Sequence, residues 1–267
     1  MLLQPWSGTV PQMKILDRPH ASVLPGRLSI AGKLAADTQR RRWQRHATAW
    51  EDHAVTGLAA VIDAVVSETD PFQTGMPPQL GVVVDIGCGG GAVALRLAAR
   101  AEKVIALDVS RAMLDTLERR ARKSEMDHVE AHCESIEAFD LPAASVDLVV
   151  SNYALHHLLD RDKQRFVTKA ARWLRPGGKL VIGDMMIGRG LVHEDRQILL
   201  HKVRLLAARG PAGWWRVMKN AWRLWSRTVE RPLPIGAWTT MLEQAGFTDV
   251  TGHRVVSEAA VVTGTRP

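Results

Sequence analysis

Two aspartates and a glycine-rich turn are the residues whose spacing points most directly to chemistry. Asp85 ends a β-branched apolar run, and the turn after it contains Gly87, Cys88 and Gly89 before a helical segment begins at Ala92. Glycine lets a ligand approach the backbone closely, and the first N–H groups of a helix are unpaired donors at its positive dipole end. This arrangement predicts a site for a nucleotide-like ligand.

The second aspartate, Asp108, ends the next predicted strand about twenty residues further on. A carboxylate at that place can accept hydrogen bonds from both hydroxyls of a ribose. The alternative is that the glycines only form a tight turn and that Asp108 caps the helix starting at Arg111. The order of strand, loop, helix and acid favours the ligand site.

The glycine pattern also allows a different class of enzyme. Gly87, Gly89 and Ala92 fit the G-x-G-x-x-A form of a dinucleotide loop, so an NAD-dependent oxidoreductase is an alternative function. Asp85 argues against it, because a carboxylate beside the loop repels a pyrophosphate and attracts a cationic amino-acid group. The charge favours a zwitterionic sulfonium cofactor. A catalytically silent nucleotide-binding protein is a further alternative.

The elements that must position these residues follow the pattern of βαβ units. After residue 80, short β-branched runs alternate with amphipathic stretches, which is typical of a buried parallel sheet with helices on both faces. Strands are predicted at residues 82–86, 104–107, 128–132, 146–150 and 179–183, helices at 92–100, 112–124 and 161–174, and a terminal antiparallel pair at 250 and 255–263. The predicted fold class is α/β, a doubly wound, mostly parallel seven-stranded Rossmann-like sheet.

The remaining segments are expected to add helices to this one domain. The chain has 267 residues, of which 46% are hydrophobic, so it can bury a substantial core. Residues 1–33 are predicted to form an irregular arm, 34–79 a helical cap and linker, and 80–267 the ligand-binding domain. Lid helices are expected over about 190–245, inserted after the fifth strand.

Two downstream segments complete a resemblance to a known family. Residues 145–158 read SVDLVVSNYALHHL, and residues 174–180 read LRPGGKL. Together with the glycine-rich turn and Asp108, these motifs make residues 80–184 resemble the class I S-adenosylmethionine-dependent methyltransferases. The resemblance is greatest to the branch of ubiquinone-type, menaquinone-type and small-molecule methyltransferases.

The resemblance implies S-adenosyl-L-methionine as the cofactor and assigns its contacts. These are Asp85, Gly87, Cys88, Gly89, Asp108, Val109, Met113, Ser135, Ile136 and Asn152. The first four would face the methionine part and Asp108 the ribose. Val109 and Met113 would lie against the adenine, and Asn152 near the methyl donor. Where the family often has an acid that contacts the adenine amino group, Ser135 aligns best here, with backbone at Ile136 or the side chain of Glu134 as alternatives.

His156 and His157 are the candidate catalytic bases. Both follow the fourth predicted strand at the carboxyl edge of the sheet, where open α/β sheets bind ligands, and imidazole titrates near the pH needed to accept a hydroxyl proton. Methyl transfer depends first on positioning, and some acceptors need no base. The alternative is that one ring caps a helix and the other packs in the interior. His193 is a weaker candidate, and no metal site is predicted because no ligand spacing suits one.

A tryptophan-rich basic segment follows the predicted fifth strand. Trp214, Trp215, Trp222 and Trp225 recur at helical spacing, with Arg and Lys elsewhere on the wheel. The segment could line an apolar pocket as a lid, or contact an anionic membrane surface to collect a lipophilic acceptor. Base stacking on nucleic acid is least favoured, because no nucleic-acid module accompanies the segment and the net charge of +7 decides nothing by itself.

The absence of a long apolar run and of a signal-peptide core leads us to expect a cytoplasmic protein, with peripheral membrane contact as an alternative. The sequence therefore predicts a methyltransferase acting on a small, apolar or lipid-like acceptor. Transfer to oxygen is favoured over transfer to carbon or nitrogen.

Overall fold

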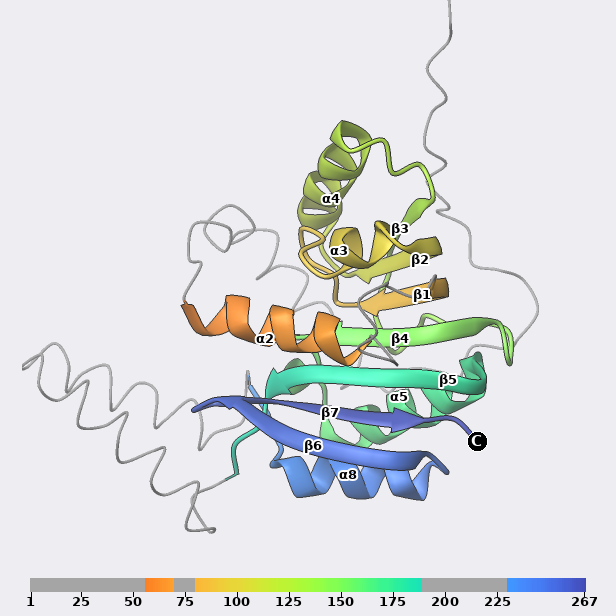
Figure 1. Ribbon diagram of the computed structural model, residues 1–267. Helices are drawn as coiled ribbons and strands as arrows, with labels where there is room; N and C mark the ends of the chain where they lie inside the picture. Colours follow the sequence, from red (N-terminus) through yellow and green to blue (C-terminus); the bar gives the residue numbers. More distant parts are fainter. Residues whose placement is uncertain (1–55, 70–79, 189–229) are drawn as a thin grey trace, which may run out of the picture.

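The computed structural model describes residues 56–69, 80–188 and 230–267, which form one α/β domain (Figure 1). Its strands are β1 (Leu80–Ile86), β2 (Ala101–Asp108), β3 (Val129–Cys133), β4 (Val146–Asn152), β5 (Leu174–Met185), β6 (Thr248–Val256) and β7 (Ala259–Thr265). Its helices are α2 (Thr56–Glu68), α3 (Ala94–Ala98), α4 (Arg111–Lys123), α5 (Asp160–Trp173) and α8 (Ile235–Gln244), with a short 3₁₀ helix η1 (Leu155–His157).

The seven strands form one sheet in the order β3-β2-β1-β4-β5-β7-β6. Strands β1 to β5 pair in parallel, whereas β7 pairs antiparallel with β5 and β6 antiparallel with β7. This confirms the predicted doubly wound sheet and its terminal antiparallel pair. The strand order reverses between β1 and β4, and ligands of open α/β sheets bind at such a switch point. Asp85 lies there, in register with Ala106 of β2 and Val150 of β4.

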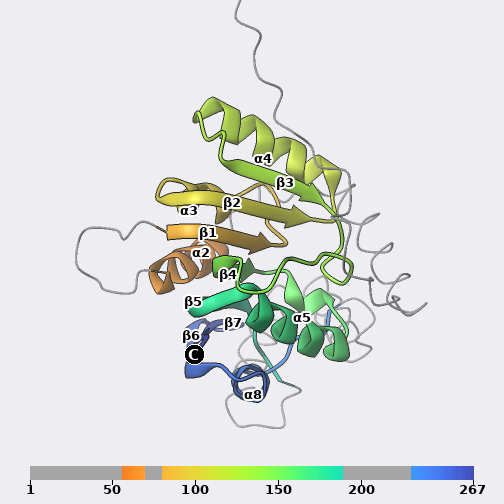
Figure 2. The same cartoon turned by 90° about the vertical axis from the view of Figure 1, so that its right-hand side faces the viewer.

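Helices cover both faces of the sheet because its strands are apolar on both sides (Figure 2). On one face, Phe166 of α5 and Trp238 of α8 belong to the same buried cluster as Val84. On the other face, residues of helices α2, α3 and α4 form a second buried cluster with the adjacent strand residue, Val83. Successive side chains of β1 therefore anchor opposite layers, and the carboxyl edge between the layers is left for the site.

Two strands run further than predicted at the edge where the site lies. Strand β4 continues to Asn152, and β5 begins at Leu174 and ends at Met185. Residues 175–178, between the predicted helix and the predicted strand, fall inside β5 as an irregularity, where Leu174 pairs with Val146 but Lys179 pairs with Leu148. The longer β5 carries Asp184 to the carboxyl edge.

The predicted cap and lid are described only in part. Helix α2 falls within the predicted cap region and packs against β4, β5, β6 and β7. Helix α8 falls at the end of the predicted lid region and packs on β6 and β7. The predicted arm at 1–33 and the tryptophan-rich segment lie outside the described residues, as does His193. Within the described ranges, no helix is long and apolar enough to cross a membrane.

Candidate functional site

The turn after β1 needs glycine for two different reasons. Gly87 has φ +71°, and a Cβ at this position would lie 2.3 Å from the Cβ of Ala154, in the segment after β4. Gly89 has φ +52°, but a Cβ there would meet no atom within 4 Å. Gly87 therefore lets the two loops touch, whereas Gly89 borders open space.

Asp85 is a buried acid whose side chain makes no well-formed hydrogen bond to any described residue. Its exposed fraction is 1%, and neither side-chain oxygen has a donor at normal hydrogen-bond geometry in this part of the chain. Burial raises the pKa of Asp85 to about 7; the nearby peptide N–H of Ala94 partly offsets this rise, and the charge of Asp108 adds to it. A buried acid left in this state is expected to bind a positively charged ligand.

Asp108 is held in place by the backbone around it. Its Oδ2 accepts from the N–H of Gly89 at 2.9 Å, and its Oδ1 accepts from the N–H of Ser110 at 2.8 Å. Burial raises the pKa of Asp108, while these N–H donors and that of Val109 lower it. Each carboxylate oxygen can accept further bonds, so Asp108 remains able to bind hydroxyl groups.

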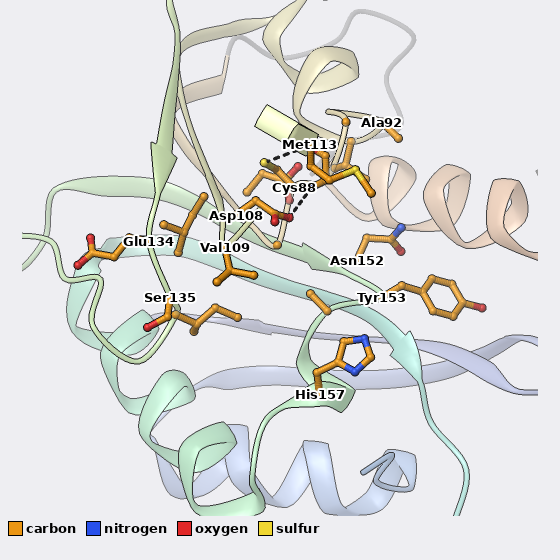
Figure 3. Close-up of a pocket in the computed structure, with 18 of the residues that line it drawn as sticks. Cys88, Ala92, Asp108, Val109, Met113, Glu134, Ser135, Asn152, Tyr153 and His157 are labelled. Atoms are coloured by element: carbon orange, nitrogen blue, oxygen red, sulfur yellow. Dashed lines mark hydrogen bonds between the residues drawn. The ribbon is translucent and has the colours of Figure 1, made fainter. Parts of the chain in front are cut away.

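A cavity of about 290 Å³ lies over these residues, and all ten predicted cofactor contacts line it: Asp85, Gly87, Cys88, Gly89, Asp108, Val109, Met113, Ser135, Ile136 and Asn152. Figure 3 shows Glu134 and Ser135 at one end of the cavity and Tyr153 and His157 at the other, with Asp108 and Val109 between them. The structure thus brings together what the sequence places up to 67 positions apart, from Asp85 to Asn152.

The end of the cavity at residues 134–137 holds several acidic and hydroxyl groups. Glu134 and Ser135 both line it, and burial raises the pKa of Glu134. Burial raises the pKa of Glu137, which also lines the cavity, and the nearby Ser135 hydroxyl partly offsets this rise. Lys169 of α5 fixes this loop by donating from Nζ to the carbonyl oxygens of Ile136 and Glu137, among others. Glu134 and Glu137 thus both present an acidic group at this end of the cavity.

The two candidate bases occupy different positions on η1. His157 lines the cavity, whereas His156 does not. His156 lies behind it: its Nδ1 is 2.5 Å from Oδ1 of Asp184, and its backbone N–H donates to Oδ2 of Asp184 at 2.8 Å. Because a carboxylate only accepts, this contact places a proton on Nδ1 of His156. The two imidazole rings lie 4.0 Å apart between centroids, tilted by 48°.

Several cavity residues were not predicted. Leu58 and Ile62 reach the cavity from α2, and Tyr153 lines it beside Asn152. Tyr153 has φ +50°, and burial, together with the charges of Glu258 and Asp184, raises its pKa. Asn152 Oδ1 is buried and finds no hydrogen-bond partner among the residues that the structure describes. Asp184, which holds His156 behind the cavity, had a usable sequence signal, as an acid that follows a predicted strand at the same edge as Asp85 and Asp108.

Residues 83–178 match the family model described as a methyltransferase domain. The chain is 34% identical over 142 residues to the 27-O-demethylrifamycin SV methyltransferase of Amycolatopsis mediterranei, covering 52% of this chain and 50% of that protein. It is 29% identical over 189 residues to the dimethylglycine N-methyltransferase of Parasynechococcus marenigrum, covering 67% and 64%. The chain thus spans less than two thirds of the length of either relative.

Solved structures share the fold at low sequence identity. The structure titled as the DhpI–SAH complex has a TM-score of 0.60 at 16% identity and covers 86% of this chain and 96% of its own. The YcgJ protein of Bacillus subtilis has a TM-score of 0.54 at 14% identity, with coverage of 77% and 97%. The chain therefore contains a methyltransferase domain over residues 83–178, and its sheet order places Asp85 of that domain at the switch point.

Proposed function

We propose that this chain transfers a methyl group from S-adenosyl-L-methionine to an oxygen atom of a small, apolar acceptor. The observation that carries the proposal is Asp85, a buried acid that lines the cavity and has no donor at normal hydrogen-bond geometry among the described residues. A cationic amino-acid group would satisfy it, whereas a pyrophosphate would be repelled. The same observation disfavours the NAD-dependent alternative.

The residues at the cavity fit the proposed cofactor from end to end. Asp85 would hold the positively charged methionine part, and Asp108 the ribose hydroxyls. Val109 and Met113 would pack against the adenine, whose amino group would donate to Ser135 or to Glu134, both of which line the cavity. When bound, the cofactor supplies an electrophilic methyl group and a neutral leaving group.

His157 is the proposed base for the acceptor hydroxyl. It lines the cavity together with Tyr153 and Ala154, the two residues that come just before η1 in the chain. His156, with its Nδ1 proton on Asp184, supports the neighbouring ring from behind. A hydroxyl must lose its proton on methylation, whereas a neutral amine can attack before losing one, so a histidine at this end favours an oxygen acceptor.

The acceptor end of the cavity favours an apolar molecule. Leu58 and Ile62 of α2 line the cavity, as does Leu158, the residue that follows His157 in the chain. Apolar side chains around a few polar groups are typical of sites for small organic ligands. The relatives named above include both an O- and an N-methyltransferase, so the choice of oxygen rests on the histidine and not on the names.

Binding and turnover test the proposal separately. Calorimetry should detect S-adenosylhomocysteine binding and no binding of NADH. A screen of phenols, aliphatic alcohols and amines with methyl-labelled donor should then transfer label to an oxygen. Binding of NADH in place of S-adenosylhomocysteine would overturn the cofactor assignment, and label found only on amines would overturn the oxygen assignment.

Peripheral contact with an anionic membrane through Trp214, Trp215, Trp222 and Trp225 stays a prediction, because this segment lies outside the described residues. Co-sedimentation with phosphatidylserine vesicles at low salt tests it. Protein that stays in the supernatant would contradict membrane contact and favour the interpretation of this segment as a pocket lid.

A further inference from the structure

Helix α5 buries a lysine that the proposed methyl transfer does not use. The side chain of Lys163 is fully buried, and its Nζ donates to Oδ1 of Asp160 at 2.9 Å and to the backbone carbonyl of Arg231. A buried ammonium group is unfavourable unless it is paired and hydrogen-bonded. Lys163 therefore ties α5 firmly to the chain segment that leads into α8.

Arg231 connects this lysine to the 3₁₀ helix η1, which carries His156 and His157 and is called the histidine turn below. The carbonyl of Arg231 accepts from Lys163, and its N–H donates to the carbonyl oxygen of His156 at 2.7 Å. On its other side, His156 is held by Asp184 through both its backbone N–H and its ring. The backbone of His156 is thus fixed from α5 and from β5 together.

The position of His156 determines where the next residue lies. The ring of His157 is 4.0 Å from that of His156 between centroids, and His157 is the one that lines the cavity. A displacement of about 1 Å at a reacting group can lower a rate on the order of a hundredfold. Contacts that hold η1 therefore bear directly on the geometry of the base.

We propose that Lys163 is a positioning residue for the histidine turn. Through Arg231 it keeps His156 on Asp184, and it thereby keeps His157 facing the acceptor end of the cavity. This inference rests on the proposed function, in which His157 is the base. It assigns to Lys163 no contact with cofactor or acceptor.

The test compares Lys163→Met with Lys169→Met in the full-length chain labelled with ¹⁵N-histidine. Methionine keeps an unbranched side chain but removes the ammonium group. Lys169 is a matched control, because it lies on the same helix and also donates to backbone carbonyls, but those of residues 136, 137 and 139. The readouts are the Nδ1–H resonance of His156, the pH titration of both imidazoles and the affinity for S-adenosylhomocysteine.

We expect Lys163→Met to shift the His156 Nδ1–H resonance or lose it through exchange, and to alter the titration of His157. Affinity for S-adenosylhomocysteine should change less than twofold. Lys169→Met should leave both histidines as in the wild type. Lys163→Gln, which keeps a neutral donor, should restore part of the His156 signal. Wild-type histidine spectra in Lys163→Met would overturn the proposal.

Two further measurements keep the test decisive. If neither Lys163 variant folds, hydrogen exchange in the wild type still reports on the contact, since the amide of Arg231 should exchange slowly and fast exchange would refute the tie. The histidine resonances can also be recorded without ligand. A wild type that binds no S-adenosylhomocysteine would therefore sink the cofactor assignment while leaving the positioning role to be judged on its own signal.

Discussion

The glycine turn, which contains Gly87 and Gly89 after β1, and the histidine turn border the same cavity but are held in place in different ways. Asp108 is fixed by the N–H groups of Ser110 and Gly89, which lie 2 and 19 positions away. His156 is fixed by Asp184, 28 positions away, and by Arg231, at the end of the segment before α8. The cofactor end is thus built from neighbouring βα units, whereas the acceptor end depends on chain segments that meet only in the folded domain.

The largest expected effect lies at the histidine turn. His157→Ala should lower kcat by roughly 10²- to 10⁴-fold, which is the usual contribution of a positioned base. The affinity for S-adenosylhomocysteine should remain within a few-fold of the wild type, since His157 belongs to the acceptor end. Single-turnover kinetics with labelled donor and calorimetry measure the two quantities. A His157→Ala enzyme with full turnover would remove the difference in roles between the two turns.

Beside the glycine turn, Asp108→Ala should weaken cofactor binding. The turnover rate of enzyme that has bound the cofactor should change little. Charge-assisted hydrogen bonds contribute about 1.5 to 3 kcal/mol each, so loss of two should raise the Kd for S-adenosylhomocysteine roughly a hundredfold or more. Isothermal calorimetry measures this change. Asp115→Ala is the control, because its carboxylate lies exposed on α4 and pairs with Arg111. Unchanged affinity in Asp108→Ala would mean that the ribose lies elsewhere.

The pKa of Asp85 predicts a smaller, pH-dependent effect. Below its pKa of about 7 the carboxyl is protonated and no longer attracts a cationic ligand, so affinity should fall as pH decreases. Between pH 8 and pH 6 the loss should be about tenfold, and Asp85→Asn should bind weakly at both values. Calorimetry in two buffers of different ionisation enthalpy should show a proton released on binding near pH 6. A flat profile in the wild type would contradict the charge argument.

For the protein without ligand, the raised pKa of Asp85 predicts the opposite trend with pH, in folding stability instead of affinity. Because burial raises the pKa of Asp85, the folded state binds a proton that the unfolded state has already lost between about pH 4 and pH 7. The stability contributed by this group should decline as pH rises through that range. Asp85→Asn should therefore raise the melting temperature at pH 8 more than at pH 5, as differential scanning calorimetry would show.

The cofactor end of the cavity could be predicted from sequence more completely than the acceptor end. Asp85, Gly89 and Asp108 could be placed from sequence because strand, turn and helix follow one another, and short β-branched runs alternating with amphipathic stretches indicated the sheet around them. The separation of His157 from His156 could not be predicted, because it depends on Asp184 at the end of a strand longer than expected. Leu58 and Ile62 were missed for a related reason: an amphipathic helix does not indicate which strands it will cross.

The smallest expected effect is the coupling energy between Gly87 and Ala154, which join the two turns. Gly87→Ala would place a Cβ 2.3 Å from that of Ala154, at a positive φ, and should destabilise the protein by about 2 to 4 kcal/mol. Ala154→Gly in the same chain should return about 1 kcal/mol, because it removes the clash but not the strain. Denaturant unfolding of the four proteins in the double-mutant cycle measures this coupling.

Gly89→Ala is the control for that cycle, since it has the backbone strain without a clash. Its coupling to Ala154→Gly should be near zero, while its Cβ, which would point into open space beside Asp108, should weaken binding of S-adenosylhomocysteine. Equal coupling energies for both glycines would mean that the coupling reflects a general loss of stability of the domain and not a direct contact between the turns. A coupling confined to Gly87 would instead locate the junction between cofactor and acceptor ends at a single pair of residues.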